Sequence, residues 1–104
     1  MIYNITFPTS LDNIDRDNDN LDVLVQTESG KQYSFVVATP DNIKHLMHKD
    51  NLPYLKPGLP FLFVERISEE NIRALLDSLF EENEQVIEIY GEDISDLSKK
   101  NKVR

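Results

Sequence analysis

The chain has 104 residues, of which 39% are hydrophobic, and this is enough for one domain with one core but not for two. It contains no cysteine, so disulfides, thiolate metal sites and a cysteine nucleophile are excluded together. Nineteen acidic residues against eleven basic ones give a net charge of −8 at pH 7, and this charge disfavours direct binding to nucleic acid.

The one cluster of basic residues is the tail at residues 99–104, which carries Lys99, Lys100, Lys102 and Arg104. Residues 1–98 alone carry a charge of −12, so we expect a globular domain over residues 1–98 and a solvated, frayed tail after it. The first residues alternate in polarity instead of forming a basic leader, and no segment approaches the roughly 20 apolar residues of a membrane helix. The expected location is the cytoplasm, with no membrane contact.

The first strand is predicted at residues 2–7, where alternation places three apolar residues on one face: Tyr3, Ile5 and Phe7. An acidic segment follows at residues 12–22, where Arg16 is the one basic residue among five aspartates: Asp12, Asp15, Asp17, Asp19 and Asp22. Because a packed core would not tolerate so many unpaired charges, we expect a solvated loop.

A hairpin is predicted from two strand segments, residues 22–27 and 31–38, which flank a short turn. Gly30 supplies the positive φ that such a turn requires. The second arm is apolar on both faces, with Tyr33, Phe35 and Val37 on one face and Val36 and Ala38 on the other. We therefore expect this arm to lie inside the sheet.

The first helix is predicted over residues 40–49. Thr39 caps it, Pro40 suits the first helical position, and Asp41 lies near the positive end of the helix dipole. Its core-facing stripe is narrow and consists of Ile43, Leu46 and Met47.

Residues 51–60 contain three prolines, which exclude a regular helix and predict an apolar loop. The next four residues, 61–64, are all apolar, a pattern typical of a strand buried on both faces. We expect this strand to be the centre of the sheet.

The second helix begins after Ser68, which caps it, and Glu69 and Glu70 follow beside the positive end of its dipole. Five apolar residues recur with helical spacing along it: Ile72, Leu75, Leu76, Leu79 and Phe80. A last strand is predicted at residues 86–90, closed by Gly91.

The predicted element order is β-ββ-α-β-α-β, with parallel strands near residues 35, 62 and 88 joined by right-handed connections. Two such connections in the same direction place both helices on one side of the sheet. We therefore expect an α/β (α+β) fold: a two-layer sandwich with a mixed sheet of about five strands and two helices on one face. A ferredoxin-like arrangement is the alternative, reached if the first strand takes another position.

A metal site on the first helix is one functional hypothesis. Asp41, His45 and His48 fall at i, i+4 and i+7, opposite the apolar stripe, so their side chains share one face. Two imidazoles and a carboxylate suit zinc or iron, but the same pattern is also typical of a solvated helix face, which is the interpretation we favour. We expect no cofactor.

The acidic segment partly matches a calcium loop, because Asp15, Asp17 and Asp19 alternate as the first ligands of such a loop do. The pattern then fails: Asp22 stands where an apolar residue is usual, and Gln26 stands where a bidentate glutamate is needed. An Asx-turn or disordered loop is the alternative that we favour.

No catalytic signature is present. The serines lie in no GxSxG motif, and three glycines in the whole chain leave no phosphate-cradling loop. We therefore expect no enzymatic activity. Glu65 and Arg66 follow the predicted central strand, where active sites of parallel sheets gather, but an ion pair at a strand end explains them better.

A binding protein is the remaining class. Ten carboxylates crowd the C-terminal half between Glu69 and Asp96, and such a surface attracts a basic protein and speeds encounter. By analogy of size and charge with small acidic bacterial proteins, we expect an immunity- or antitoxin-type inhibitor. The predicted partner-binding residues are the apolar Tyr54, Leu55 and Leu59 and the acidic Asp77, Glu81 and Glu84.

Three alternatives stay open at this stage. The acidity serves solubility alone, with the apolar loop residues capping the core. The helix stripe binds a divalent metal. The chain is a subunit of a homo-oligomer, such as a homodimer, that pairs through a sheet edge.

Overall fold

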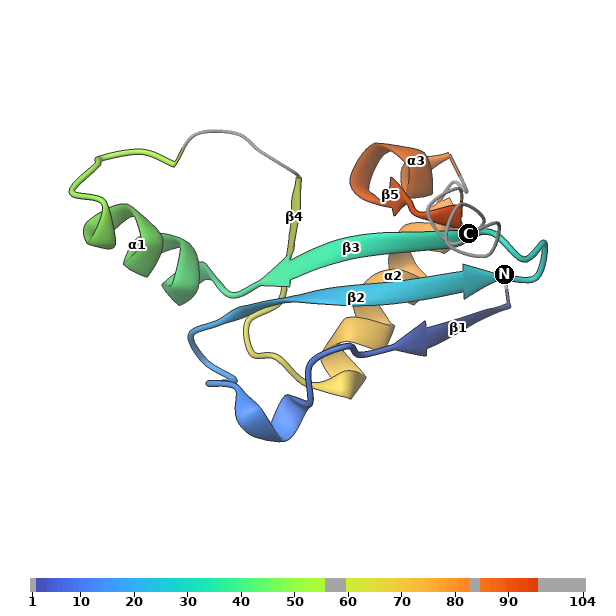
Figure 1. Ribbon diagram of the computed structural model, residues 1–104, viewed down its shortest axis with the longest axis horizontal. Helices are drawn as coiled ribbons and strands as arrows, with labels where there is room; N and C mark the ends of the chain where they lie inside the picture. Colours follow the sequence, from blue (N-terminus) through green and yellow to red (C-terminus); the bar gives the residue numbers. More distant parts are fainter. Residues whose placement is uncertain (1, 56–59, 83–84, 96–104) are drawn as a thin grey trace, which may run out of the picture.

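The sheet has five strands and mixed direction (Figure 1). The computed structural model describes residues 2–55, 60–82 and 85–95. The strands are β1 (Tyr3–Thr6), β2 (Asn20–Thr27), β3 (Gln32–Ala38), β4 (Phe61–Phe63) and β5 (Glu92–Asp93). β1, β2 and β3 are antiparallel neighbours, β4 runs parallel to β3, and β5 runs antiparallel to it. This confirms the predicted α+β class with a mixed five-stranded sheet.

The β2–β3 hairpin forms as predicted. The Gly30 amide donates to the Thr27 carbonyl at 3.0 Å, and the Thr27 amide donates to the Lys31 carbonyl at 3.0 Å. Gly30 has φ 87°, a conformation that glycine adopts without the steric cost of a Cβ. In the register that follows, the three inward-facing residues of β2 (Leu21, Val23 and Val25) lie opposite Val37, Phe35 and Tyr33 of β3, and all six are buried.

β3 is the centre of the sheet, and the predicted central position of the strand near residue 62 is wrong. β4 and β5 both pair with the same edge of β3, β4 at its carboxyl end and β5 at its amino end. Leu62 is buried and faces the core, whereas Phe63 is 52% exposed. The apolar run therefore reflects burial on one face only, with aromatic side chains left on the other.

α1 (Pro40–Lys49) has the predicted bounds, and the Thr39 hydroxyl caps it by accepting from the Asn42 amide at 3.3 Å. Its apolar stripe is half-buried, but none of the residues of the buried core cluster belongs to α1. Figure 1 shows α1 beyond the carboxyl end of β3, away from α2. Buried Asn42 holds α1 in this position. Its side-chain oxygen accepts from the Asn20 side chain at 2.7 Å, and its side-chain nitrogen donates to the Asn18 side chain at 3.2 Å.

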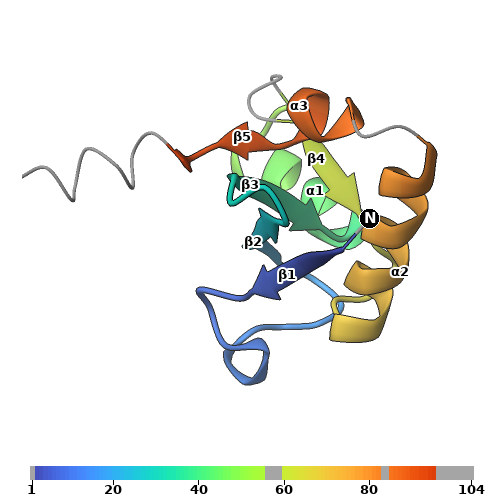
Figure 2. The same ribbon diagram turned by 90° about the vertical axis from the view of Figure 1, so that its right-hand side faces the viewer.

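α2 (Glu69–Glu82) closes the core. The Ser68 hydroxyl accepts from the Asn71 amide at 3.0 Å, which confirms the predicted cap. Three residues of its apolar face are buried and pack on the sheet: Ile72, Leu76 and Phe80. Figures 1 and 2 both place α2 across one face of the sheet.

The strand predicted at residues 86–90 is wrong, because these residues form a short helix, α3 (Val86–Tyr90). Ile87 enters the core, Ile89 is 65% exposed, and the Gly91 amide closes the last turn on the Ile87 carbonyl at 2.7 Å. The helix therefore buries one isoleucine of this segment and leaves the other in solvent. The core is closed by α2 and α3, rather than by α1 and α2. The short β5 follows, so the expected third parallel strand is replaced by an antiparallel one.

None of the helices in the described parts of the chain combines the length and the apolar character needed to cross a membrane.

Candidate functional site

The histidine stripe of α1 is exposed along its whole length: Asp41, His45 and His48 all lie at the surface. Among the described residues, which include all three, the structure brings together no group of three or more His, Asp or Glu side chains able to hold a metal ion. The geometry therefore adds no support to the predicted metal site.

The acidic segment is ordered by its own aspartates. The Asp15 carboxylate accepts from the Asp17 amide at 3.0 Å, and the Asp19 carboxylate accepts from the Asp15 amide at 3.3 Å. A short 3₁₀ helix, Leu11–Asn13, precedes these bonds. The segment thus contains Asx-turn geometry, in which carboxylate oxygens accept from backbone amides close in sequence.

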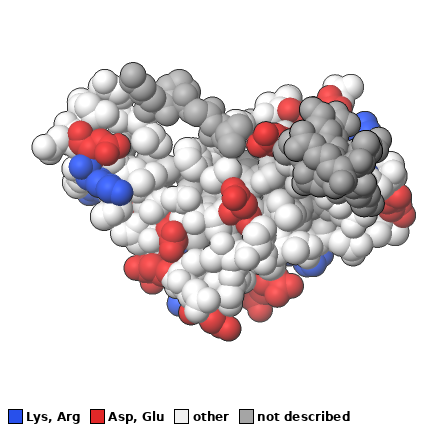
Figure 3. All heavy atoms as spheres, in the orientation of Figure 1, with Lys and Arg blue, Asp and Glu red and all other residues white. Residues whose placement is uncertain are grey.

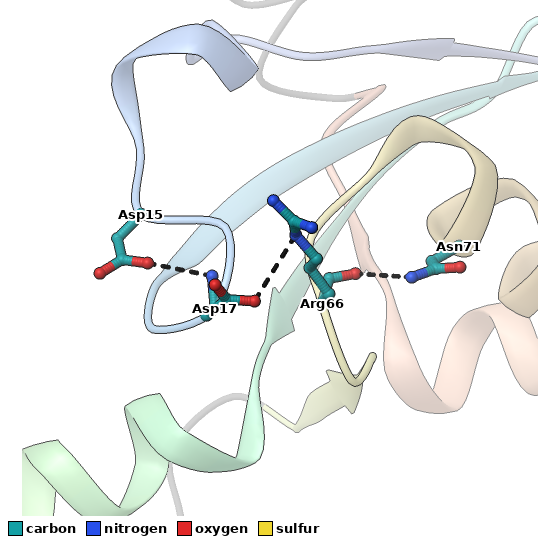
Figure 4. A network of polar contacts seen from close by, with 4 residues as sticks. All are labelled: Asp15, Asp17, Arg66 and Asn71. Atoms are coloured by element: carbon teal, nitrogen blue, oxygen red, sulfur yellow. Dashed lines mark hydrogen bonds and ion pairs between the residues drawn. The ribbon is translucent and has the colours of Figure 1, made fainter.

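The segment is also tied to the turn after β4 (Figure 4). Arg66 lies 3.5 Å from the Asp17 carboxylate, and its carbonyl accepts from the Asn71 side chain at 2.9 Å. The Ile67 amide donates to the Arg16 carbonyl at 2.7 Å. Arg66, one of the two residues considered for catalysis, therefore takes part in an exposed ion pair that links two loops.

The four predicted partner-binding residues that the structure describes do not form one surface. Tyr54 is 50% exposed on the loop after α1, whereas Asp77 and Glu81 are exposed on α2. Figure 1 places that loop and α2 in different parts of the molecule. Leu55 is half-buried beside Tyr54. Leu59 and Glu84 lie outside the described residues.

Asp77 has a structural partner, because it accepts a hydrogen bond from the Tyr3 hydroxyl. The Tyr3 ring packs edge-on against Phe80 at 4.9 Å between centroids, and the Arg73 guanidinium lies 5.9 Å from the same ring. Burial raises the pKa of Tyr3 well above its usual range, and the hydrogen bond to Asp77 raises it further. This cluster fastens the edge strand β1 to α2.

Apolar side chains gather elsewhere, on the outer side of the sheet at β4 and on α3. We call this the β4–α3 surface, and it consists of Val36, Pro60, Phe61, Phe63, Ile89 and Tyr90. The register places Phe61 beside Val36, and the rings of Phe61 and Phe63 lie 6.4 Å apart. Phe63, Ile89 and Tyr90 are three of the six large hydrophobic residues exposed in the described chain.

A cavity of about 230 Å³ opens within this surface. Its walls come from β3, the start of β4 and the α3–β5 junction: Ser34, Val36, Pro60, Ile89, Tyr90, Gly91 and Glu92. Two larger hollows, of about 500 Å³ each, lie beside the hairpin turn and at the start of α2. Polar and charged side chains make up most of the lining of both, so they lack the exposed apolar anchors of the smaller one.

Carboxylates border the β4–α3 surface. Glu88 lies within α3, Glu92 and Asp93 follow the helix in β5, and Glu65 continues the exposed alternation of β4; all four are exposed. Figure 3 shows acidic groups spaced over an otherwise mainly uncharged surface on this side of the molecule. Such a surface combines apolar anchors with a negative field.

Sequence reasoning missed the β4–α3 surface for a physical reason. Residues 61–64 are all apolar, and residues 86–90 carry four apolar side chains around Glu88; such short segments predict strands from the sequence alone. Phe63 and Ile89 are exposed because β4 is an edge strand and because residues 86–90 are helical, and neither fact is visible in the local pattern.

Comparison of the chain with family models, with curated proteins and with solved structures found no match.

Proposed function

We propose that this protein is a small acidic binding protein without enzymatic activity, which docks a basic protein on the β4–α3 surface. The observation that carries the proposal is the exposure of Phe63, Ile89 and Tyr90 on one side of the molecule, beside exposed carboxylates. By analogy of size and charge, the partner is a basic toxin or nuclease that the protein inhibits.

The apolar residues supply affinity in this proposal. Removing a large exposed side chain from water stabilises a complex by about 1.5–3 kcal/mol when burial is complete. Aromatic residues are enriched among the few interface positions that dominate binding energy. Tyr90 and the Phe61–Phe63 pair therefore fit the role of anchors.

In this proposal the carboxylates determine which proteins bind. A chain with net charge −8 attracts basic proteins over a Debye length of about 10 Å at 0.1 M salt, and it repels acidic proteins, including second copies of itself. Rim charges mainly raise the association rate, so added salt slows encounter more than it weakens the apolar contacts.

The proposal is tested by capture from lysate of the native host, with the purified chain as bait and washes at low and high salt. A retained basic protein supports it only if capture depends on the proposed surface. Ile89→Ser and Phe63→Ser are expected to lose the captured protein. Ile2→Ser is the matched control, because Ile2 is 69% exposed on the amino-terminal side of β1, away from β4, and its change is expected to leave capture intact.

Two outcomes contradict the proposal. Capture that survives both Ile89→Ser and Phe63→Ser places the partner elsewhere on the chain. A stable dimer in sedimentation, lost in Phe63→Ser, assigns the surface to a second copy instead of a basic partner.

A further inference from the structure

The cavity in the β4–α3 surface has a particular chemistry. Its lining residues include the apolar Val36, Pro60 and Ile89, one aromatic residue, Tyr90, and one acidic residue, Glu92. Its volume of about 230 Å³ equals roughly eight water molecules at about 30 Å³ each, enough for one long side chain.

The Glu92 carboxylate is available for a ligand. Glu92 is exposed, and among the residues that the structure describes it has no ion-pair partner. Its backbone is fixed, because β5 pairs Glu92 with Ser34 and the neighbouring Ile94 amide donates to the Gln32 carbonyl at 2.9 Å. The charge therefore sits on an anchored strand beside the cavity.

We infer that this cavity receives an arginine side chain of the basic partner. The inference rests on the proposed function and names the group by which the partner is recognised. The methylene stem of arginine packs on Pro60, Val36 and Ile89, as long basic side chains do on apolar walls. The guanidinium lies against the Tyr90 ring and pairs with Glu92.

Arginine fits this lining better than lysine. Its planar guanidinium stacks on an aromatic ring and presents paired N–H donors to a carboxylate, while the Ser34 hydroxyl offers a further acceptor. The lysine ammonium is compact and strongly hydrated, so it loses more on entering an apolar pocket.

The test is an NMR titration of the ¹⁵N-labelled full chain with three capped tripeptides, Gly-X-Gly, in which X is arginine, lysine or citrulline. Citrulline has nearly the shape of arginine but no charge. We expect the arginine peptide to shift the amide signals of Ser34, Gly91 and Glu92 in a saturable way. The citrulline peptide is expected to bind about tenfold more weakly, which is the loss of one charge-assisted hydrogen bond.

Two substitutions locate the binding. Glu92→Gln is expected to remove the preference for arginine over citrulline. Glu28→Gln removes one charge from the exposed hairpin turn and is the control, with the preference expected to persist. The inference is overturned if arginine and citrulline peptides bind equally, if no peptide gives saturable shifts, or if the shifts fall on other residues such as the 12–22 segment.

The same variants separate this inference from the proposed function. If capture of a basic protein is lost in Ile89→Ser but unchanged in Glu92→Gln, the binding function stands and the arginine pocket is wrong. If neither change affects capture, the docking surface itself is wrong.

Discussion

The two faces of the sheet have opposite characters. The inner face presents Val23, Phe35 and Val37, each fully buried under α2 and α3. The outer face presents half-buried Val36 and exposed Phe63 together with polar residues. Aromatic residues on neighbouring strands thus serve different ends: those inside hold the fold together, and those outside remain free to contact another molecule.

The largest expected effect is on the inner face. Phe35→Ala removes a fully buried ring and leaves a cavity, so we expect a loss of about 3–5 kcal/mol in the free energy of unfolding, measured by urea denaturation. Phe63→Ala deletes the same atoms from the outer face of the next strand. We expect a much smaller loss for Phe63→Ala. A loss similar to that of Phe35→Ala would show that the Phe63 ring stabilises the fold.

Gly91→Ala is expected to cost about 1–3 kcal/mol, by overpacking. A Cβ at Gly91 would lie 2.8 Å from the Phe35 ring and 2.9 Å from the Ile87 carbonyl oxygen, although the backbone φ there is ordinary. A double-mutant cycle with Phe35→Leu checks the cause. If the shorter side chain relieves none of the loss, the contact with the carbonyl is responsible instead of the ring.

Tyr3→Phe tests the fastening of β1 to α2. It removes the hydrogen bond to Asp77, and we expect a loss of about 1 kcal/mol near pH 7. Because the pKa of Tyr3 is raised in the folded protein, its stabilising contribution is complete below the usual tyrosine pKa of about 10 and is lost as pH rises above it toward the higher folded pKa.

Urea denaturation of wild type and Tyr3→Phe between pH 7 and pH 11 measures this dependence. The stability difference between the two proteins should shrink as pH rises above the usual tyrosine pKa. A difference that stays constant to pH 11 would mean that the hydroxyl proton has no part in the contact.

The smallest effect on stability is expected for Phe63→Ser. An exposed residue away from caps and buried partners usually changes stability by no more than about 0.5 kcal/mol. Its effect on partner capture should be large, so the ratio of the two effects marks a binding residue. If Phe63→Ser lowers the melting temperature as much as Phe35→Ala does, Phe63 is a residue of the core and not of a binding surface.

Local patterns in the sequence predicted those features that depend on neighbouring residues. The Thr39 and Ser68 caps, the Gly30 turn and the bounds of α1 are local hydrogen-bonding and φ preferences, and all were predicted correctly. Features that depend on contacts between distant residues were predicted less well. Residues 86–90 satisfy both helical and extended spacing over so short a run, and contact with Phe35 and α2 decides between them.

The candidate site was mostly beyond prediction. The charge of the surface follows from composition, but its apolar anchors depend on which strand lies at an edge and which residue of a helix turn meets the core. Asp77, which stays a predicted partner-binding residue, also accepts a hydrogen bond from Tyr3, a residue 74 positions away in sequence.

By itself the sequence determined the α+β class, the hairpin, both main helices and the acidic character, because each depends on composition or on contacts between near neighbours. The tertiary structure alone decided that β3 is central, that α1 lies outside the core and is held by Asn42, and that Phe63, Ile89 and Tyr90 share one exposed side. The reason is that pairing order and burial are set by contacts between segments far apart in the chain, which no local pattern encodes.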